Sequence, residues 1–256
     1  MSATPVDRST TSTAGRHRPA QWAVMARILV PEAMRSLLIT TGVMLVVLAV
    51  GTLIARWRGW QLVEMTQADL AQLEVVVGTD GVTIVASLFL LPAAVGIAAL
   101  VMAIVLAART RVYVATGATR GAVAVGHLLT ILVMTAYTLL VTAVVLLVVG
   151  AAGARELLGA DGAGDLVLLG LQALGSILLA LTASSAITVL FLRWPWWVGT
   201  GVLILAFVVL PTVAALLLPG APDVITRVTG WWGWDLALAV LATSVYWWLI
   251  RRVPVR

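Results

Sequence analysis

Cysteine and lysine are both absent from the 256 residues of this sequence. Without Cys the chain has no disulfide, thiolate nucleophile, Cys-ligated zinc site or iron–sulfur cluster. Without Lys it has neither an ordinary P-loop, whose Lys contacts the β- and γ-phosphates of a nucleotide, nor a Schiff-base Lys. Its two His, His17 and His127, are too few for a multi-histidine metal site. We therefore expect no enzyme activity, cofactor or metal on this chain.

Charged residues are also scarce, at 11%, whereas 62% of the residues are hydrophobic and the mean hydropathy is +1.09. Soluble domains carry about 25% charged and about 45–50% apolar residues, so the composition predicts an integral membrane protein. A helix of about 20 apolar residues crosses the hydrocarbon core of a bilayer. Five charge-free runs and a sixth run interrupted only by Asp235 predict an all-α membrane protein with six transmembrane helices, at about 36–55, 82–107, 122–149, 166–192, 196–218 and 231–250.

The sixteen basic residues are all Arg, and their distribution predicts the orientation of the spans. With both termini in the cytoplasm, twelve Arg lie in cytoplasmic segments and four, Arg56, Arg58, Arg155 and Arg227, lie outside. Cytoplasmic segments of membrane proteins carry such an excess of positive charge. Ten of the eleven Trp also lie near the predicted span ends, where an aromatic belt meets the lipid headgroups. We therefore expect cytoplasmic N- and C-termini.

The segment before the first span is expected to have two parts. Residues 1–19, rich in Ser, Thr, Arg and Pro, predict a disordered cytoplasmic tail. Residues 20–35 predict a short amphipathic helix on the cytoplasmic face of the bilayer, and Pro31 before Glu32 is typical of the first turn of a new helix. Residues 251–256 form the other predicted cytoplasmic tail. The residues expected to define the faces of the interfacial helix are Trp22, Met25, Arg27 and Leu29.

Polar side chains within the predicted spans each admit two interpretations. His127 is either a packing His hydrogen-bonded to a neighbour or a group that handles protons or substrate. Asp235 is either an acid favoured by the dipole at a helix N-terminus or a contact for an exported substrate. The hydroxyl groups either bond to their own helix or a neighbouring one, or line a transport pathway. The candidate pathway-lining residues are Thr135, Thr138, Thr142, Ser184, Ser185 and Asp235.

The link between the second and third predicted spans, residues 109–121 (RTRVYVATGATRG), is short and basic. An ordinary inner loop accounts for its Arg residues through the excess of positive charge in the cytoplasm. It does not account for Gly117 and Gly121, or for Tyr113 among small residues. We interpret residues 109–121 as a compact elbow that is continuous with two long helices, so that a force on the elbow tilts both.

At the elbow the sequence resembles permease subunits of ABC transporters of the ABC-2 export type. In that family the element after the second span commonly reads as an Arg, an aromatic residue and a G-x-[ST]-R stretch. These positions are here Arg111, Tyr113 and the run Gly117, Ala118, Thr119 and Arg120. The likeness covers nearly the whole chain, in its length, its six predicted spans, its cytoplasmic termini and the amphipathic helix before the first span.

The resemblance implies a mechanism and a set of partners. Two permease subunits, identical or paralogous, enclose a translocation pathway, and separate ATPase subunits that bind ATP and Mg²⁺ dock from the cytoplasm. Closure of the ATPase subunits moves the elbow and switches the pathway between two states. Membrane lipid is a further expected partner, and no nucleic acid is expected. The residues expected to contact the ATPase are Arg109, Arg111, Tyr113, Gly117, Thr119 and Arg120.

The expected location is the bacterial cytoplasmic membrane, because Arg-only, Ala-, Val- and Gly-rich usage is typical of GC-rich bacteria. Two other functions stay open at this point. A non-enzymatic membrane sensor or accessory subunit would present the elbow to a different cytoplasmic protein. An ion-coupled secondary transporter would work without ATP, and the charge-free centres of the predicted spans disfavour it.

Overall fold

A computed structural model of the protein describes residues 20–58, 77–78, 81–82, 90–150, 163–205, 209 and 233–252. Within these ranges the long helices are α1 (Gln21–Trp57), α3 (Leu90–Ala108), α5 (Arg120–Gly150), α6 (Ala163–Arg193) and α10 (Trp234–Ile250). The shorter helices are α4 (Thr110–Ala115) and α7 (Trp196–Ile204). Strands β1 (Val77–Gly78) and β2 (Gly81–Val82) form a small antiparallel pair.

Helices long and apolar enough to cross a bilayer make up most of the described chain. Four such segments are Gln21–Gly51, Leu90–Ala115, Arg120–Val145 and Val167–Arg193. Their outer surfaces carry large exposed apolar side chains, such as Val46 at 62% and Ile97 at 65% exposure. Water-soluble proteins do not expose apolar surface on this scale. The chain is therefore a helical, multi-pass membrane protein.

Four of the predicted spans fall on these four helices. The spans at 122–149 and 166–192 lie inside α5 and α6, and the span at 36–55 lies inside α1. The span predicted at 82–107 begins too early, because Val82 belongs to β2 and the described part of α3 begins at Leu90.

The last two predicted spans are described only in part. The fifth, at 196–218, begins with α7, and most of it lies outside the described residues. The sixth, at 231–250, contains α10, an apolar helix of 17 residues. The predicted tail at 1–19 and residues 253–256 of the other predicted tail also lie outside the described residues.

The N-terminal segment differs from its prediction, because residues 20–35 are not a separate helix. α1 runs without interruption from Gln21 to Trp57 and contains Pro31. Membrane helices tolerate an internal Pro because neighbouring groups satisfy the backbone that it leaves free. The apolar side chains expected to face lipid also face protein: Met25 and Leu29 are buried against the bundle. The other two predicted interfacial residues, Trp22 at 47% exposure and Arg27, stay on the surface.

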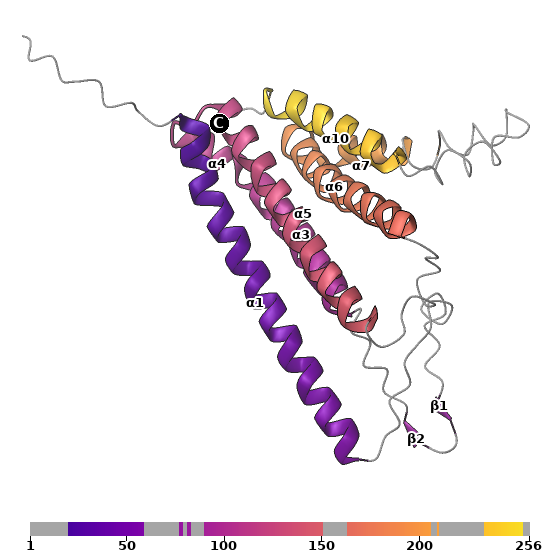
Figure 1. Cartoon of the computed structure of the whole chain (residues 1–256). Helices are drawn as coiled ribbons and strands as arrows, with labels where there is room; N and C mark the ends of the chain where they lie inside the picture. The colour runs from indigo at the N-terminus through magenta and orange to yellow at the C-terminus, as the bar shows by residue number, and fades with distance from the viewer. Residues whose placement is uncertain are drawn as a thin grey trace, which may run out of the picture.

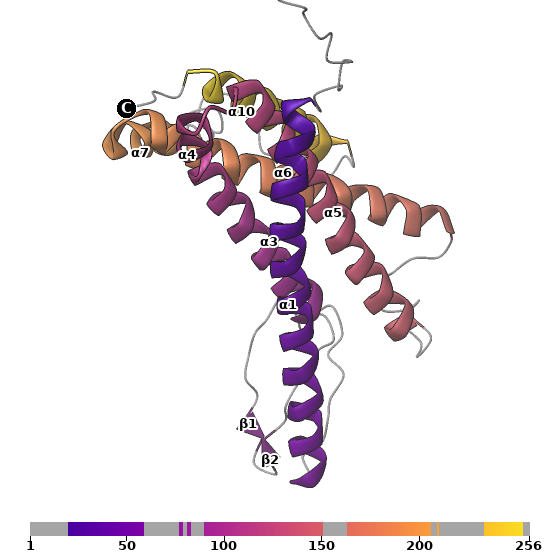
Figure 2. The same ribbon diagram turned by 90° about the vertical axis from the view of Figure 1, so that its left-hand side faces the viewer.

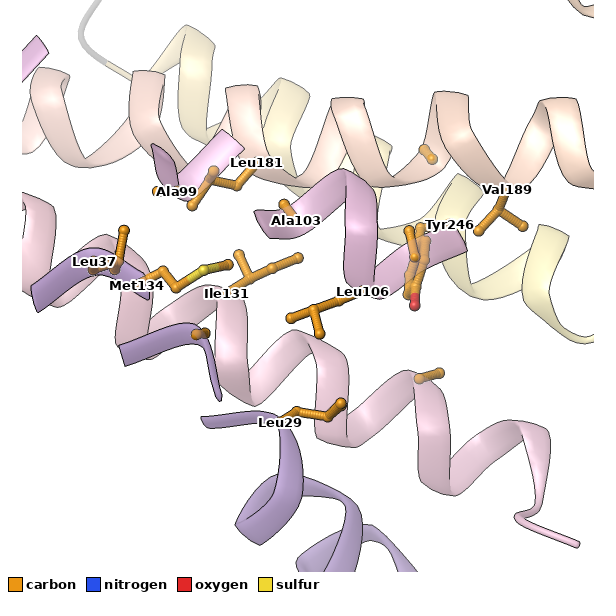
Figure 3. Close-up of a cluster of buried hydrophobic side chains, with 14 of the residues drawn as sticks. Leu29, Leu37, Ala99, Ala103, Leu106, Ile131, Met134, Leu181, Val189 and Tyr246 are labelled. Carbon is orange, nitrogen blue, oxygen red and sulfur yellow. The ribbon is translucent and has the colours of Figure 1, made fainter. Parts of the chain in front are cut away.

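The helices pack around one core (Figure 1). α1, α3 and α5 contact one another, α6 contacts α3 and α5, and α10 lies along α6. Figure 3 shows side chains from five helices in this core, among them Leu29 of α1, Leu106 of α3, Ile131 of α5, Leu181 of α6 and Tyr246 of α10. These five side chains are almost fully buried.

Small side chains bring α3 close to its neighbours. Ala99, Ala103 and Ala107, four residues apart and therefore on one face of the helix, are all fully buried. Interfaces between membrane helices are enriched in such small residues because they let backbones approach closely. Figures 1 and 2 show the helices meeting at the end of the bundle that contains α4 and diverging away from it. This end contains the elbow.

Candidate functional site

The elbow begins with a bend of a single residue between two helices. α3 ends at Ala108, Arg109 forms a turn, and α4 follows at Thr110. The amide of Arg109 donates to the carbonyl of Val105 at 3.1 Å, and the carbonyl of Arg109 accepts from the amide of Val112 at 3.0 Å. Backbone hydrogen bonds therefore continue from α3 into α4.

A glycine turn closes the other end of α4. Gly117 has φ of +98°, in the left-handed region that favours glycine. The amide of Ala118 donates to the carbonyl of Tyr113 at 3.0 Å, and the amide of Gly117 donates to that of Val114 at 3.1 Å. This pair of bonds is a Schellman motif, which ends a helix compactly. The compact turn predicted from the sequence is therefore present.

Thr119 connects the turn to α5 and to α1. Its hydroxyl accepts a hydrogen bond from the amide of Ala122 at 3.3 Å, which is the usual arrangement of a helix N-cap. Its own amide donates to Oε1 of Gln21, at the beginning of α1, at 3.3 Å. The elbow is thus fixed both to the helix that follows it and to the first turn of α1.

Two Arg side chains add further connections. Arg109 forms an ion pair with Glu32 of α1, and Nη1 of Arg120 donates to the carbonyl of Arg251, just after α10, at 2.8 Å. Gln21 and Arg251, near the two ends of the described chain, therefore lie at the same end of the bundle. Although Glu32 and Arg251 are far from the elbow in sequence, these contacts bring α1 and the end of α10 together around it.

The six residues predicted to contact an ATPase separate into two groups. Arg109, Arg111, Gly117 and Thr119 are exposed, whereas Tyr113 and Arg120 are half-buried. Tyr113 packs against the hydrophobic core, a contact that holds α4 against the bundle. Val112, which the sequence reasoning did not select, is 59% exposed beside Arg111. The outward face of α4 is therefore both basic and apolar.

A buried polar cluster lies beneath the elbow. Nδ1 of His127 and the hydroxyl of Tyr246 are 2.6 Å apart, and their rings meet edge to face. Thr110, the first residue of α4, faces the same Tyr246 hydroxyl. All three side chains have exposures of 1% or less. The cluster joins α4, α5 and α10 inside the bundle.

The interpretation of His127 as a packing residue with a hydrogen-bonded neighbour is confirmed, and its partner was not identified from the sequence. A buried Tyr hydroxyl usually has a hydrogen-bond partner, so Tyr246 within an apolar helix was the available signal. The hydroxyl of Thr110 and Nε2 of His127 are buried without a hydrogen-bond partner among the described residues.

The hydroxyls proposed to line a pathway mostly bond to their own helices. Those of Thr135, Thr138 and Ser185 are buried and donate to the carbonyl four residues earlier, at 2.8–2.9 Å. Thr142 and Ser184 make the same kind of bond and are partly exposed. The intrahelical interpretation is therefore confirmed for these five side chains, and a surface role is open only to the last two.

Asp235, in the first turn of α10, bonds to a neighbouring helix. Its carboxylate accepts a hydrogen bond from the hydroxyl of Ser176 in α6. The helices are close here, because a Cβ at Gly175 would lie 3.0 Å from Cβ of Asp235. Asp235 is partly exposed, and its contact with Ser176 is a structural contact between α6 and α10.

Comparison of the chain with family models, with curated proteins and with solved structures finds no match. Within the described ranges, no three His, Asp or Glu side chains come close enough to hold a metal ion. The candidate site of the described chain is the elbow, a short exposed helix with its flanking turns, which hydrogen bonds join to α1, α3, α5 and α10.

Proposed function

We propose that the protein is the transmembrane permease subunit of an ATP-driven ABC exporter. It pairs with a second permease subunit to enclose a translocation pathway and binds separate ATPase subunits through the 109–121 elbow. The observation that supports this proposal best is the construction of the elbow, in which an exposed face is joined by hydrogen bonds to α1, α3, α5 and α10.

The connections of the elbow suit the transmission of force. α4 continues the backbone ladder of α3, and the N-cap at Thr119 fixes it to α5. The ion pair of Arg109 with Glu32 and the bond of Arg120 to the Arg251 carbonyl extend the connection to α1 and α10. A partner that shifts α4 therefore shifts four helices together. Such a partner drives a two-state transition when it binds one arrangement more tightly than the other.

The outward face of α4 suits a protein partner. Val112 is an apolar side chain at 59% exposure, and Arg111 beside it is also exposed. An apolar contact surrounded by positive charge fits an ATPase surface that presents an apolar pocket with an acidic rim, because interfaces combine an apolar core with complementary charges.

A photocrosslinking amino acid placed at Val112 tests the proposal. In membranes of cells that naturally produce the chain, we expect an adduct with an ATP-binding protein. Val101 of α3 provides the matched control, because it is also a Val and is 49% exposed, but it lies on the apolar span. The same photoreactive residue at Val101 should give no such adduct.

Two outcomes contradict the export proposal. An adduct between position 112 and a protein that does not bind ATP supports an accessory or sensor subunit instead. The absence of any protein adduct at position 112, with and without ATP and Mg²⁺, removes the docking role of the elbow altogether.

A further inference from the structure

A second group of Arg side chains lies at the junction of α6 and α10. The guanidinium carbon of Arg193, the last residue of α6, is 4.8 Å from the ring centre of Trp248 in α10. The guanidinium carbon of Arg252 is 4.9 Å from the same ring. Arg193 also lies over Trp194, at 4.5 Å. Two guanidinium groups thus lie against the ring of Trp248, where the negative face of an aromatic ring attracts a cation.

These two charges have no acidic neighbour in the part of the chain that the structure describes. The carboxylate of Glu32 is paired with Arg109 instead. Nη1 of Arg193 is buried and has no hydrogen-bond partner among the described residues. A buried donor without an acceptor is costly, and two neighbouring cations repel each other. The arrangement therefore calls for an anion that accepts hydrogen bonds from Arg193.

The surroundings of the cluster indicate which kind of anion it is. Arg193 ends the apolar segment that begins at Val167, so the cluster lies where the span leaves the hydrocarbon and where Trp side chains meet the headgroups. Exposed apolar side chains flank it, including Phe191 at 37%, Trp197 at 64% and Val245 at 41%. A ligand seated here contacts cations with one part and apolar surface with the other.

We propose that Arg193 and Arg252, both stacked on Trp248, bind the phosphate of an anionic phospholipid. Guanidinium groups bind phosphate oxygens with short, paired hydrogen bonds, and stacking on the indole holds each guanidinium in place before the lipid arrives. A zwitterionic lipid brings its own cation into a site that already holds two, so the site selects anionic headgroups. This site is independent of the elbow and of the export proposal.

Native mass spectrometry of the full chain in detergent tests the site. The purified protein is incubated with an equimolar mixture of phosphatidylglycerol and phosphatidylcholine, and the lipids that stay bound are counted. The wild type should retain phosphatidylglycerol in preference to phosphatidylcholine. In the double variant Arg193→Gln/Arg252→Gln, retention of phosphatidylglycerol should fall by about tenfold or more, as expected for lost hydrogen bonds to a charged group.

The double variant Arg27→Gln/Arg35→Gln is the matched control. It removes the same charge from exposed Arg side chains of α1, on the helix that also contributes Glu32 to the elbow. We expect its retention of phosphatidylglycerol to match that of the wild type. Equal losses in the two double variants would show diffuse attraction of lipid to positive charge and would overturn the proposal.

Two measurements on the wild type keep the test decisive if the Arg193→Gln/Arg252→Gln variant does not fold. Equal retention of phosphatidylglycerol and phosphatidylcholine by the wild type overturns the proposal. So does complete displacement of phosphatidylglycerol by inorganic phosphate, because the bound group would then be free phosphate rather than a lipid. Retention of phosphatidylglycerol in the presence of phosphate supports a lipid site.

Discussion

At the scale of single residues, the hydrogen bond between His127 and Tyr246 is the contact whose loss should be easiest to measure. In Tyr246→Phe the ring stays, but Nδ1 of His127 loses its partner at 2.6 Å in a fully buried position. An unsatisfied buried group costs about 1–3 kcal/mol, and hydrogen bonds between membrane helices average about 0.6 kcal/mol. We expect a lower midpoint of thermal unfolding in detergent, measured by circular dichroism.

Thr243→Val in the same helix is the control for this substitution. The Thr243 hydroxyl donates to the carbonyl of Ala239 in its own helix, so its removal breaks no contact between helices. We expect a midpoint close to that of the wild type. If Tyr246→Phe is equally stable, the His127–Tyr246 bond adds nothing measurable to the joint between α5 and α10.

The residue-level predictions from the sequence succeeded where one residue type has one dominant physical role. Gly117 was expected in a tight turn, and its positive φ requires that turn. For Thr135 and Ser185 the sequence left two interpretations open, and the structure shows the bond within the helix, because the nearest acceptor of a hydroxyl in an apolar span is its own backbone. The partner of His127 could not be identified, since it lies 119 positions away on α10 and no local pattern links the two.

At the scale of elements, the contact between α1 and α5 depends on one glycine. A Cβ built on Gly126 would lie 2.8 Å from Cβ of Met25 and 3.3 Å from the backbone nitrogen of Ala26. Because backbone cannot yield as a side chain can, Gly126→Ala must separate the two helices. We expect destabilisation of about 1–3 kcal/mol, the usual cost of overpacking, measured as a lower unfolding midpoint in detergent.

Gly96→Ala provides the comparison for that substitution. Nothing lies within 4 Å of a Cβ built on Gly96, which also sits inside an apolar helix, α3. There the helix preference of Ala over Gly acts alone and should stabilise the protein by about 0.5–1 kcal/mol. The two substitutions should therefore change the midpoint in opposite directions, and a shared direction would contradict the close approach at Gly126.

The limits of sequence reasoning at this scale are clearest in α1. Amphipathic spacing around Met25 and Leu29 was interpreted as a helix lying on the membrane. The same spacing suits a helix that packs on another one, and here the partner is α5. Pro31 was interpreted as a helix start because Pro favours that position, yet it lies inside a helix of 37 residues. Tertiary packing decides whether the apolar face of a helix meets the membrane or another helix, and the local sequence pattern does not distinguish the two.

At the scale of the whole molecule, hydropathy and the positions of the charged residues predicted where the long helices lie, but not which helices contact one another. The four long apolar helices fall on predicted spans, because about 20 apolar residues need a bilayer whatever they pack against. Arg111, Arg120, Arg193 and Arg252 lie near helix ends in the structure, as the charge-free runs required. Charge pattern is a property of the linear chain, so it can be predicted before any fold is known.

The export proposal makes its sharpest whole-molecule prediction at Gly117. In Gly117→Trp an L side chain must occupy φ of +98°, which costs about 1–2 kcal/mol, and a bulky ring is added to the exposed face that should meet the ATPase. We expect ATP-dependent transport to be abolished and recovery of the ATPase subunit with the tagged chain to fall roughly tenfold or more, given that each 1.4 kcal/mol is a factor of ten. The spans should still insert, since their hydropathy is unchanged, and protease protection of the membrane-embedded protein measures this.

Gly201→Trp separates docking from a general effect of a new Trp. Gly201 is exposed on α7 and its backbone φ is not positive. A Cβ added to it would meet nothing within 4 Å. This variant should insert and recover the ATPase subunit as the wild type does. If Gly117→Trp also recovers the subunit fully, the turn between α4 and α5 is not where the partner binds. The partner would then have to bind another surface of the bundle, and the contacts that join the elbow to α1, α3, α5 and α10 would serve only to hold these helices together.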